Sequence, residues 1–459
     1  MKTSERLSRI WKGNRRTRLS PSQIIALAFA AIIALGTVLL CLPIASRSGQ
    51  SCGFRPALFT ATSATCVTGL VLYDTWSQWS GFGQAVILCM IEIGGLGFMS
   101  AASFVLFVLR RKVGLRQRMV IAQALSLNEI EGAVRLQRSV LLISLILETG
   151  GALILTLRFW PAYGFTRALR WGVFHAVSAY CNAGFDIFGA LEPGSSMMLF
   201  QNDPVVLLTL SALIIMGGLG FFVWEEILGG KKIKQFSVYT KLVLLMTGCL
   251  LLGGTVLFCV LEWSNPGTLA GMSIPQKILN GFFQSTTVRT AGFAAVDQNL
   301  LTNAGKGLAI VLMMIGGSSG STAGGVKTVT VVVLLLFMVS RSRGKNTVSV
   351  FRHTIPEGKV LDAMTIISIM FGLALFGGIF ISATSPVAFT DALFEAVSAL
   401  ATVGLTAGTT EKLSVVSQIL IIIYMYFGRV GVLTISMGFL AGNRAEERFR
   451  YAYTNLLIG

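Results

Sequence analysis

Four short stretches of the sequence end in loops whose residues could offer oxygen ligands to a cation. They align without gaps over twelve residues: FTATSATCVTGL (59–70), FHAVSAYCNAGF (174–185), FFQSTTVRTAGF (282–293) and FEAVSALATVGL (394–405). Each begins with Phe, has Ser or Thr at its fifth position and ends in Gly-Leu or Gly-Phe. The loops that close them contain no carboxylate, so backbone carbonyls, supported by Thr or Asn oxygens, must provide the ligands.

Rings of backbone carbonyls that replace a hydration shell are the device by which potassium pores select their ion. Glycine suits such a loop because it adopts backbone dihedrals that other residues resist. We therefore expect a potassium-binding selectivity filter at twelve residues: Val67, Thr68, Gly69, Asn182, Ala183, Gly184, Thr290, Ala291, Gly292, Thr402, Val403 and Gly404. The alternative is that these glycines are packing contacts between membrane helices, which are common. Four aligned loops favour the filter.

A second glycine-bearing mark follows each of the four stretches. These marks are GGLGF (94–98), GGLGF (217–221), GGSSG (316–320) and GRVG (428–431). The starts of the four stretches are separated by 115, 108 and 112 residues, so the paired marks define a fourfold internal repeat.

Each repeat is predicted to be a helix, a short re-entrant segment of about ten residues and a second helix. The re-entrant segment is too short to span a membrane. Non-helical backbone at membrane depth is tolerated only where protein buries it or where it lines a watery cavity. Four such segments meet this condition if they converge on one axis. Their short helices would then direct C-termini of roughly −0.5 charge each toward that axis, which attracts cations.

The composition indicates a polytopic α-helical membrane protein. Of 459 residues, 54% are hydrophobic and 12% are charged. The net charge of +17 comes mostly from five clusters, which hold 26 of the 37 Lys and Arg residues at 1–20, 110–138, 230–241, 340–359 and 442–459. This positive-inside pattern predicts a protein of the cell membrane (plasma or inner) with both termini in the cytoplasm. It accounts for the basic net charge, so no nucleic-acid partner is expected. No P-loop, nucleophile elbow or zinc signature is found in the sequence, so an enzyme is not expected.

The fold class predicted is all-α integral membrane, with four tandem repeats around one pore and about eight spanning helices. The expected organisation is a basic N-terminus (1–20), repeat 1 (21–110), a linker (111–137), repeat 2 (138–229), a linker (230–240), repeat 3 (241–340), a linker (341–359), repeat 4 (360–441) and a C-terminal tail (442–459).

Residues 316–328 interrupt the apolar span of repeat 3. Their sequence, GGSSGSTAGGVKT, cannot hold a regular helix. One interpretation is an extramembrane turn. The other is an intramembrane loop, which is favoured because the two flanking apolar pieces are each too short to span alone.

The four loops, their spacing and the later Gly- and Arg-bearing segments resemble the Trk/Ktr/HKT superfamily of potassium transporters along essentially the whole chain. The start of the chain and its tail are more similar to the Ktr membrane (pore) subunit than to the longer Trk subunit. By this resemblance, Gly69 in the first loop goes with potassium selectivity, since serine there goes with sodium. The resemblance also implies a homodimer in the membrane lipid that rests on a separate cytoplasmic nucleotide-binding ring.

The resemblance further assigns a gate beneath the filter. Its expected residues are Gly316, Gly317, Ser318, Ser319, Gly320, Ser321, Thr322, Ala323, Gly324, Gly325 and Arg429. Arg429 would act as a positive barrier in the pore, as a charge inside a membrane helix is a functional candidate by default. The alternative is a structural ion pair with Glu92 or Glu148. No covalently bound cofactor is expected. The ion expected to bind is potassium, and sodium is left open as a second ion. A nucleotide is expected on the regulatory partner only.

Weaker candidates surround the loops. Arg289 precedes the third filter glycine and is interpreted as a tie to neighbouring carbonyls, while His175 is interpreted as a packing or capping residue. Asp74 and Asp297 each follow a filter glycine by five residues and either draw cations to the outer mouth or are solvated turn acids.

Two transport mechanisms remain open at this point. One is channel-like potassium uptake driven by membrane potential, with sodium stimulation left open. The other is a sodium- or proton-coupled potassium symporter, which usually places titratable groups beside the substrate. The loops lack such groups, which favours the first. A membrane anchor without transport is disfavoured by the loops.

Overall fold

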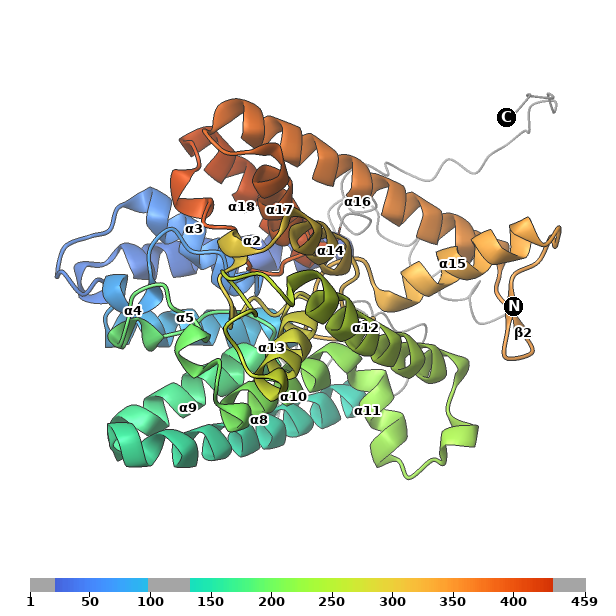
Figure 1. The fold of residues 1–459 in the computed structure, drawn as a ribbon, viewed down its shortest axis with the longest axis horizontal. Coiled ribbons are helices and arrows are strands. Elements are labelled where there is room, and N and C mark those ends of the chain that lie inside the picture. Colours follow the sequence, from blue (N-terminus) through green and yellow to red (C-terminus); the bar gives the residue numbers. More distant parts are fainter. Residues whose placement is uncertain (1–20, 98–132, 432–459) are drawn as a thin grey trace, which may run out of the picture.

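The structure is a computed structural model and describes residues 21–97 and 133–431. The regular secondary structure of the described chain is almost entirely helical, and its helices recur in four sets (Figure 1). Set 1 contains α2 (Pro21–Cys41), α3 (Phe54–Thr65), the short α4 (Thr75–Gln78) and α5 (Gly81–Leu96). Set 2 contains α8 (Ala133–Tyr163), α9 (Phe165–Tyr180), α10 (Pro204–Leu219) and α11 (Phe221–Leu228).

The other two sets repeat this order. Set 3 contains α12 (Val238–Glu262), α13 (Ile274–Thr287), α14 (Asn303–Met314) and α15 (Thr328–Ser342). Set 4 contains α16 (Glu357–Thr384), α17 (Phe389–Leu400) and α18 (Val415–Val430), and a small antiparallel hairpin of β1 (Ser349–Val350) and β2 (His353–Thr354) joins the two sets. The predicted fold class is confirmed. The two ends and the 111–132 part of the first linker, with their basic clusters, lie outside the described residues.

The first helix of each set is long and apolar enough to cross a membrane. These four helices, α2, α8, α12 and α16, are 20 to 28 residues long over their qualifying spans. Large apolar side chains such as Leu252 and Val260 lie exposed along α12. Exposed apolar surface of this kind is stable against lipid and unstable against water, so the chain is a multi-pass membrane protein.

The second helix of each set breaks at the glycine mark. The helices α5, α10 and α18 end one residue before Gly97, Gly220 and Gly431, whose φ angles are +85°, +88° and +90°. At Gly220 the chain turns by 97° into α11. In set 3 the break is wider, since α14 ends at Met314 and α15 begins at Thr328. Positive φ is the region that glycine enters without a steric penalty, which explains the residue type at three of the breaks.

The start of every second helix is also fixed by a side chain. Ser80, Asp203, Thr302 and Ser414 each accept a hydrogen bond from a backbone N–H in the first turn of α5, α10, α14 and α18, respectively. Such N-caps satisfy amide groups that the helix itself leaves unpaired. The four second helices therefore begin at chemically equivalent positions.

The four sets close into a ring. The second helix of each set packs on the short helix of the next: α5 on α9, α10 on α13, α14 on α17 and, to close the circle, α18 on α3. In Figure 1 the sets follow one another around a common centre in the colour order of the sequence. The short helices are 12 to 16 residues long, longer than the ten expected, because each begins several residues before the aligned Phe.

Candidate functional site

The loops that follow the four short helices share one backbone conformation. In each loop two residues have positive φ and the residue between them does not: Val67 and Gly69, Asn182 and Gly184, Thr290 and Gly292, Thr402 and Gly404. For Val67, Asn182, Thr290 and Thr402 the φ angles lie between +51° and +68°, where a side chain is rarely found. Alternation of the sign of φ turns successive carbonyls toward the same side of the chain. Strained backbone of this kind persists only where surrounding structure holds it.

The four glycines pack against one another in cyclic order. A Cβ added to Gly69 would lie 2.5 Å from the Ala183 carbonyl oxygen, and one added to Gly184 would lie 2.7 Å from that of Ala291. One added to Gly292 would collide with the Val403 oxygen, and one added to Gly404 would collide with the Thr68 oxygen. Only glycine fits here, because each Cα faces the carbonyl of the neighbouring loop. The loops thus form a closed ring that is rich in carbonyl oxygens.

Hydroxyl groups at the ends of the short helices tie the loops down. Ser63 and Ser398 accept hydrogen bonds of 3.0 and 3.1 Å from the backbone N–H of Gly69 and Gly404. In set 2, Ser178 donates to the Phe185 carbonyl over 2.7 Å.

Set 3 differs by one residue. There Thr287, and not the aligned Thr286, donates to the Phe293 carbonyl over 2.7 Å. Thr286 donates instead to Phe282 in its own helix. The gap-free sequence alignment hides this shift, in which the third helix ends one residue early and its loop is one residue longer.

Glycines of the second helices allow these helices to pack closely against the C-terminal ends of the short helices. A Cβ on Gly94, Gly217 or Gly428 would collide with the carbonyl oxygen of the residue that ends the short helix of the same set: Thr65, Tyr180 or Leu400, respectively. The helices α5, α10 and α18 therefore approach the helix ends to backbone contact. This explains why a second glycine mark accompanies the first in sets 1, 2 and 4.

The non-helical segment between α14 and α15 is anchored on set 2. The amides of Ser318 and Thr322 donate to the carbonyls of Gly218 and Gly217 over 3.0 and 3.3 Å. The Thr322 hydroxyl donates to the carbonyl of Tyr180 over 3.0 Å and lies 3.3 Å from Oδ1 of Asn182. The segment is therefore attached to the end of α9 and to a residue of the second loop. A Cβ on Gly324 would also collide with the Thr402 hydroxyl, which places the segment against the fourth loop.

Arg429 links three parts of the ring. Its guanidinium donates to the carbonyls of Gly94, Gly95 and Thr322, with an Nε–O distance of 3.2 Å to Gly94 and an Nη2–O distance of 2.7 Å to Gly95. The side chain therefore joins α18, the end of α5 and the 316–325 segment. The alternative of an ion pair with Glu92 or Glu148 is wrong, since no ion pair of Arg429 occurs in the described part of the chain.

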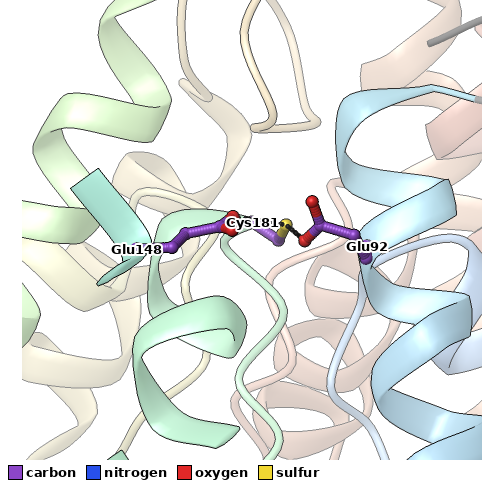
Figure 2. A group of neighbouring side chains, drawn as sticks. All are labelled: Glu92, Glu148 and Cys181. Atoms are coloured by element: carbon purple, nitrogen blue, oxygen red, sulfur yellow. Dashed lines mark hydrogen bonds between the residues drawn. The ribbon is translucent and has the colours of Figure 1, made fainter. Parts of the chain in front are cut away.

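Glu92 and Glu148 instead converge on Cys181 (Figure 2). The Cys181 thiol lies 3.5 Å from a Glu92 oxygen and 3.9 Å from a Glu148 oxygen, and the three ligand atoms lie within 4.8 Å of one another. Cys181 follows α9 and directly precedes Asn182 in the second loop. Two carboxyl groups and a thiol in this place can hold a proton or a cation.

The weaker candidates take the following positions. His175 is buried, with its Nδ1 2.7 Å from the Trp171 carbonyl and its ring stacked on Phe188, as expected of a packing residue. Asp74 caps α4 and accepts from the Gly194 amide, and Asp297 caps a short turn at 298–300, so both have structural partners. The predicted tie of Arg289 to nearby carbonyls is wrong: no hydrogen bond of its guanidinium is found among the described residues.

Sequence reasoning missed Glu395. This fully buried carboxylate in α17 accepts hydrogen bonds from the hydroxyls of Thr406, Thr409 and Thr410, which lie just beyond the fourth loop. It holds the outer end of that loop. The available signal was an acidic residue within a re-entrant segment whose other three copies have Thr, His or Phe at that position.

Three comparisons with known proteins bear on this arrangement. A protein-family model, TrkH, described as a cation transport protein, matches residues 7–446. The potassium/sodium uptake protein NtpJ of Enterococcus hirae is 40% identical over 455 residues, which is 98% of this chain and all of that protein. The Ktr system potassium uptake protein B of Bacillus subtilis is 38% identical, over 94% of this chain and 96% of that one.

The fold is also found in a solved structure. The potassium transporter TrkH from Vibrio parahaemolyticus superposes with a TM-score of 0.70 over 94% of this chain and 86% of that chain, at 17% sequence identity. At this identity the likeness concerns the fold alone.

Proposed function

Because the chain belongs to the TrkH family of cation transport proteins, we propose that it takes up potassium across a cell membrane through the ring of four loops. The observation that carries this proposal is the closed ring, in which each glycine Cα faces a carbonyl of the next loop. Carbonyl rings of this kind replace the hydration shell of potassium. The names of the relatives, which include potassium uptake proteins, support the same ion.

The filter residues are proposed to be the twelve that the sequence predicts. Within each loop the two positive-φ residues orient the carbonyls, and the hydroxyls of Ser63, Ser178, Thr287 and Ser398 hold the loop in place. The C-terminal ends of α3, α9, α13 and α17 lead directly into the ring, so their partial negative charges favour a cation there.

The 316–325 segment with Arg429 is proposed to be the gate. The segment touches the second and fourth loops through Thr322 and Gly324, so it lies directly beside the ion path. Arg429 fixes it to α5 and α18 and adds a positive charge that opposes cation passage. Backbone at membrane depth is stable here because its amides are bonded to Gly217 and Gly218.

We further propose that the channel lies in the plasma or inner membrane with both termini in the cytoplasm, acts as a homodimer and is regulated by a cytoplasmic nucleotide-binding ring. The basic linkers 110–138, 230–241 and 340–359 would dock that ring, and sodium stimulation would accompany regulation. In the described part of these linkers, Lys232, Lys234 and Arg343 are exposed.

Proton-coupled potassium symport is the second candidate, and the Glu92–Glu148–Cys181 cluster favours it (Figure 2). The cluster supplies titratable groups directly behind the second loop, which the loops themselves lack. Coupled transporters place such groups beside the substrate site.

Flux measurements in liposomes separate the two functions. We expect rubidium to accumulate in response to an inside-negative potential, with potassium competing better than sodium. We expect a pH or sodium gradient to drive no accumulation at zero potential. Accumulation driven by a pH gradient alone, and lost in Glu148→Gln, would establish the symporter instead. Absence of any cation flux from correctly folded protein would overturn both.

A further inference from the structure

Arg289 is a buried cation with no counter-charge in the described structure. Its side chain lies just after α13, three residues before Gly292. It is 8% exposed, its Nε has no hydrogen-bond partner, and none of the ion pairs among the described residues includes it. A buried charge without a partner is strongly unfavourable, so such a group marks a missing ligand.

The Arg289 side chain lines a small cavity behind the third loop. The cavity has a volume of about 10 Å³, and its walls come from α10, α12, α13 and the 316–325 segment. Thr247 of α12 lines it as well, is 6% exposed, and has a hydroxyl without a hydrogen-bond partner. One small cavity thus brings together two buried polar groups whose bonds are not made within the protein.

The chemistry of these groups restricts the occupant. A guanidinium N–H only donates, so the occupant must accept a hydrogen bond. A volume of about 10 Å³ admits a single particle the size of a water molecule. Of the other lining residues, Ile214 and Ile215 are apolar, and the Thr286 hydroxyl already donates to the Phe282 carbonyl. The small volume therefore excludes a larger polar molecule.

Charge decides between the two small acceptors, water and a monatomic anion. Water would satisfy the hydrogen bonds but would leave the guanidinium uncompensated beside a path for cations. The C-terminal end of α13 offsets part of the charge, since a helix end carries roughly half an electron charge. A monatomic anion supplies the rest.

We propose that this cavity is a binding site for one halide ion, chloride under ordinary conditions, held by the Arg289 guanidinium and the Thr247 hydroxyl. The ion neutralises Arg289 and so removes a repulsive charge three residues from the carbonyl of Gly292. It also packs the third loop against Gly317 of the 316–325 segment, which lines the same cavity. The site stands on its own geometry and does not depend on the transported ion being potassium.

Bromide provides the direct test. The full-length protein is purified and crystallised with bromide in place of chloride, and anomalous scattering is measured at the bromine edge. We expect one peak between Arg289 and Thr247. An ordered water there without anomalous signal, or bromide on the protein surface only, overturns the proposal.

Thermal unfolding in detergent gives a second readout that needs no crystal. A ligand that binds only the folded state raises the melting temperature in a saturable way. We expect chloride, titrated against gluconate at constant ionic strength, to raise the melting temperature of the wild type in this saturable way. Thr247→Val keeps the side-chain shape and removes the hydroxyl, and we expect it to weaken or abolish this saturable rise while the protein stays folded.

Thr255→Val is the matched control. Thr255 lies two turns further along α12 and donates to the Leu251 carbonyl over 2.6 Å, outside the cavity. We expect its chloride dependence to match the wild type. A rise that is equal in all three proteins would show a general salt effect and refute the site. Arg289→Gln adds a fourth curve, in which the chloride dependence is expected to disappear.

Discussion

At the residue scale, the proposed filter depends on four glycines that have no room for a side chain. A Cβ on Gly69 or Gly292 would collide with a carbonyl oxygen of the neighbouring loop, and both residues have positive φ. A side chain there must push that carbonyl away from the proposed ion path. The unfavourable dihedral alone costs about 1–2 kcal/mol.

We therefore expect Gly69→Ser and Gly292→Ser each to weaken apparent potassium affinity by roughly one to two orders of magnitude, since about 1.4 kcal/mol corresponds to tenfold. Discrimination against sodium should fall in parallel. The measurement is rubidium uptake, with sodium as competitor, in cells without other uptake systems. Gly253→Ser is the control, because a Cβ at Gly253 in α12 meets nothing within 4 Å. Wild-type affinity in both Gly69→Ser and Gly292→Ser would leave these two glycines only a packing role.

A second residue-scale prediction concerns Glu395. Its carboxylate accepts from three Thr hydroxyls, whereas the amide nitrogen of a glutamine at this position could not accept any. Glu395→Gln should lower the free energy of unfolding by roughly 1–3 kcal/mol, the cost of leaving buried hydroxyls unsatisfied. The check is the melting temperature in detergent. An unchanged melting temperature would show that the Thr cluster finds other acceptors.

The sequence pointed to the loop residues because they recur, but it did not reveal their partners. Gly69 and Gly292 could be recognised from position in a fourfold pattern. The partners of Arg429 could not be recognised from the sequence, because they are the backbone carbonyls of Gly94, Gly95 and Thr322, and every residue has a backbone carbonyl. The missing partner of Arg289 was equally invisible, since only coordinates show that a charge has none.

At the element scale, the broken helix of set 3 is the feature most suited to movement. The 316–325 segment is held by backbone hydrogen bonds to Gly217 and Gly218 and by the hydroxyls of Ser318, Thr322 and Tyr239. Arg429 and the Phe221 amide add bonds to the carbonyls of Thr322 and Gly320, so all of the attachments to neighbouring elements named here are polar contacts that can break and re-form.

We expect deletion of Ser318–Ala323 to raise basal potassium flux in the absence of any regulator, because the deletion removes the part of the segment that touches the second loop. Flux into liposomes of known protein content is the measurement. Size-exclusion behaviour like that of the wild type is the control for folding. Unchanged or lower flux from a well-folded variant would count against a gate.

Arg429→Ala tests the electrostatic part of the same element. Removing the charge and the bonds to Gly95 and Thr322 should increase maximal flux, while apparent potassium affinity, which the loops are proposed to set, should stay close to wild type. Arg429→Lys keeps the charge but cannot reach three carbonyls at once, so its maximal flux should lie between those of the wild type and Arg429→Ala. Equal flux in Lys and Ala variants would assign the effect to the hydrogen bonds and not to the charge.

The elements themselves were the most predictable level. Apolar runs and glycine marks predicted the long helices and the interrupted ones. The short helices extend further toward their N-termini than expected, because Gly53 and Gly164 start α3 and α9 well before the aligned Phe. The one-residue shift in set 3 was hidden, since both Thr286 and Thr287 are threonine and only their hydrogen bonds distinguish them.

At the scale of the whole molecule, function is proposed to depend on a ring that no single set can form. Each set contributes one loop, and each glycine needs the carbonyl of the following set to define its place. The fourfold period in sequence predicted convergence on one axis. It did not predict that each second helix packs on the short helix of the next set, since that order arises from the packing of α5, α10, α14 and α18 in space.

This arrangement makes a prediction for a divided chain. A cut between Gly230 and Lys231 falls in an exposed linker and separates sets 1 and 2 from sets 3 and 4. The two halves are joined by non-covalent contacts on both sides, α10 with α13 and α18 with α3.

We expect cells that express both halves to regain potassium uptake and to yield a co-purifying pair. Each half alone should give only background uptake, because it supplies two loops of four. Uptake by one half alone would contradict a filter made of four loops from one chain. Co-purification without uptake would show that the covalent linker is needed to set the ring.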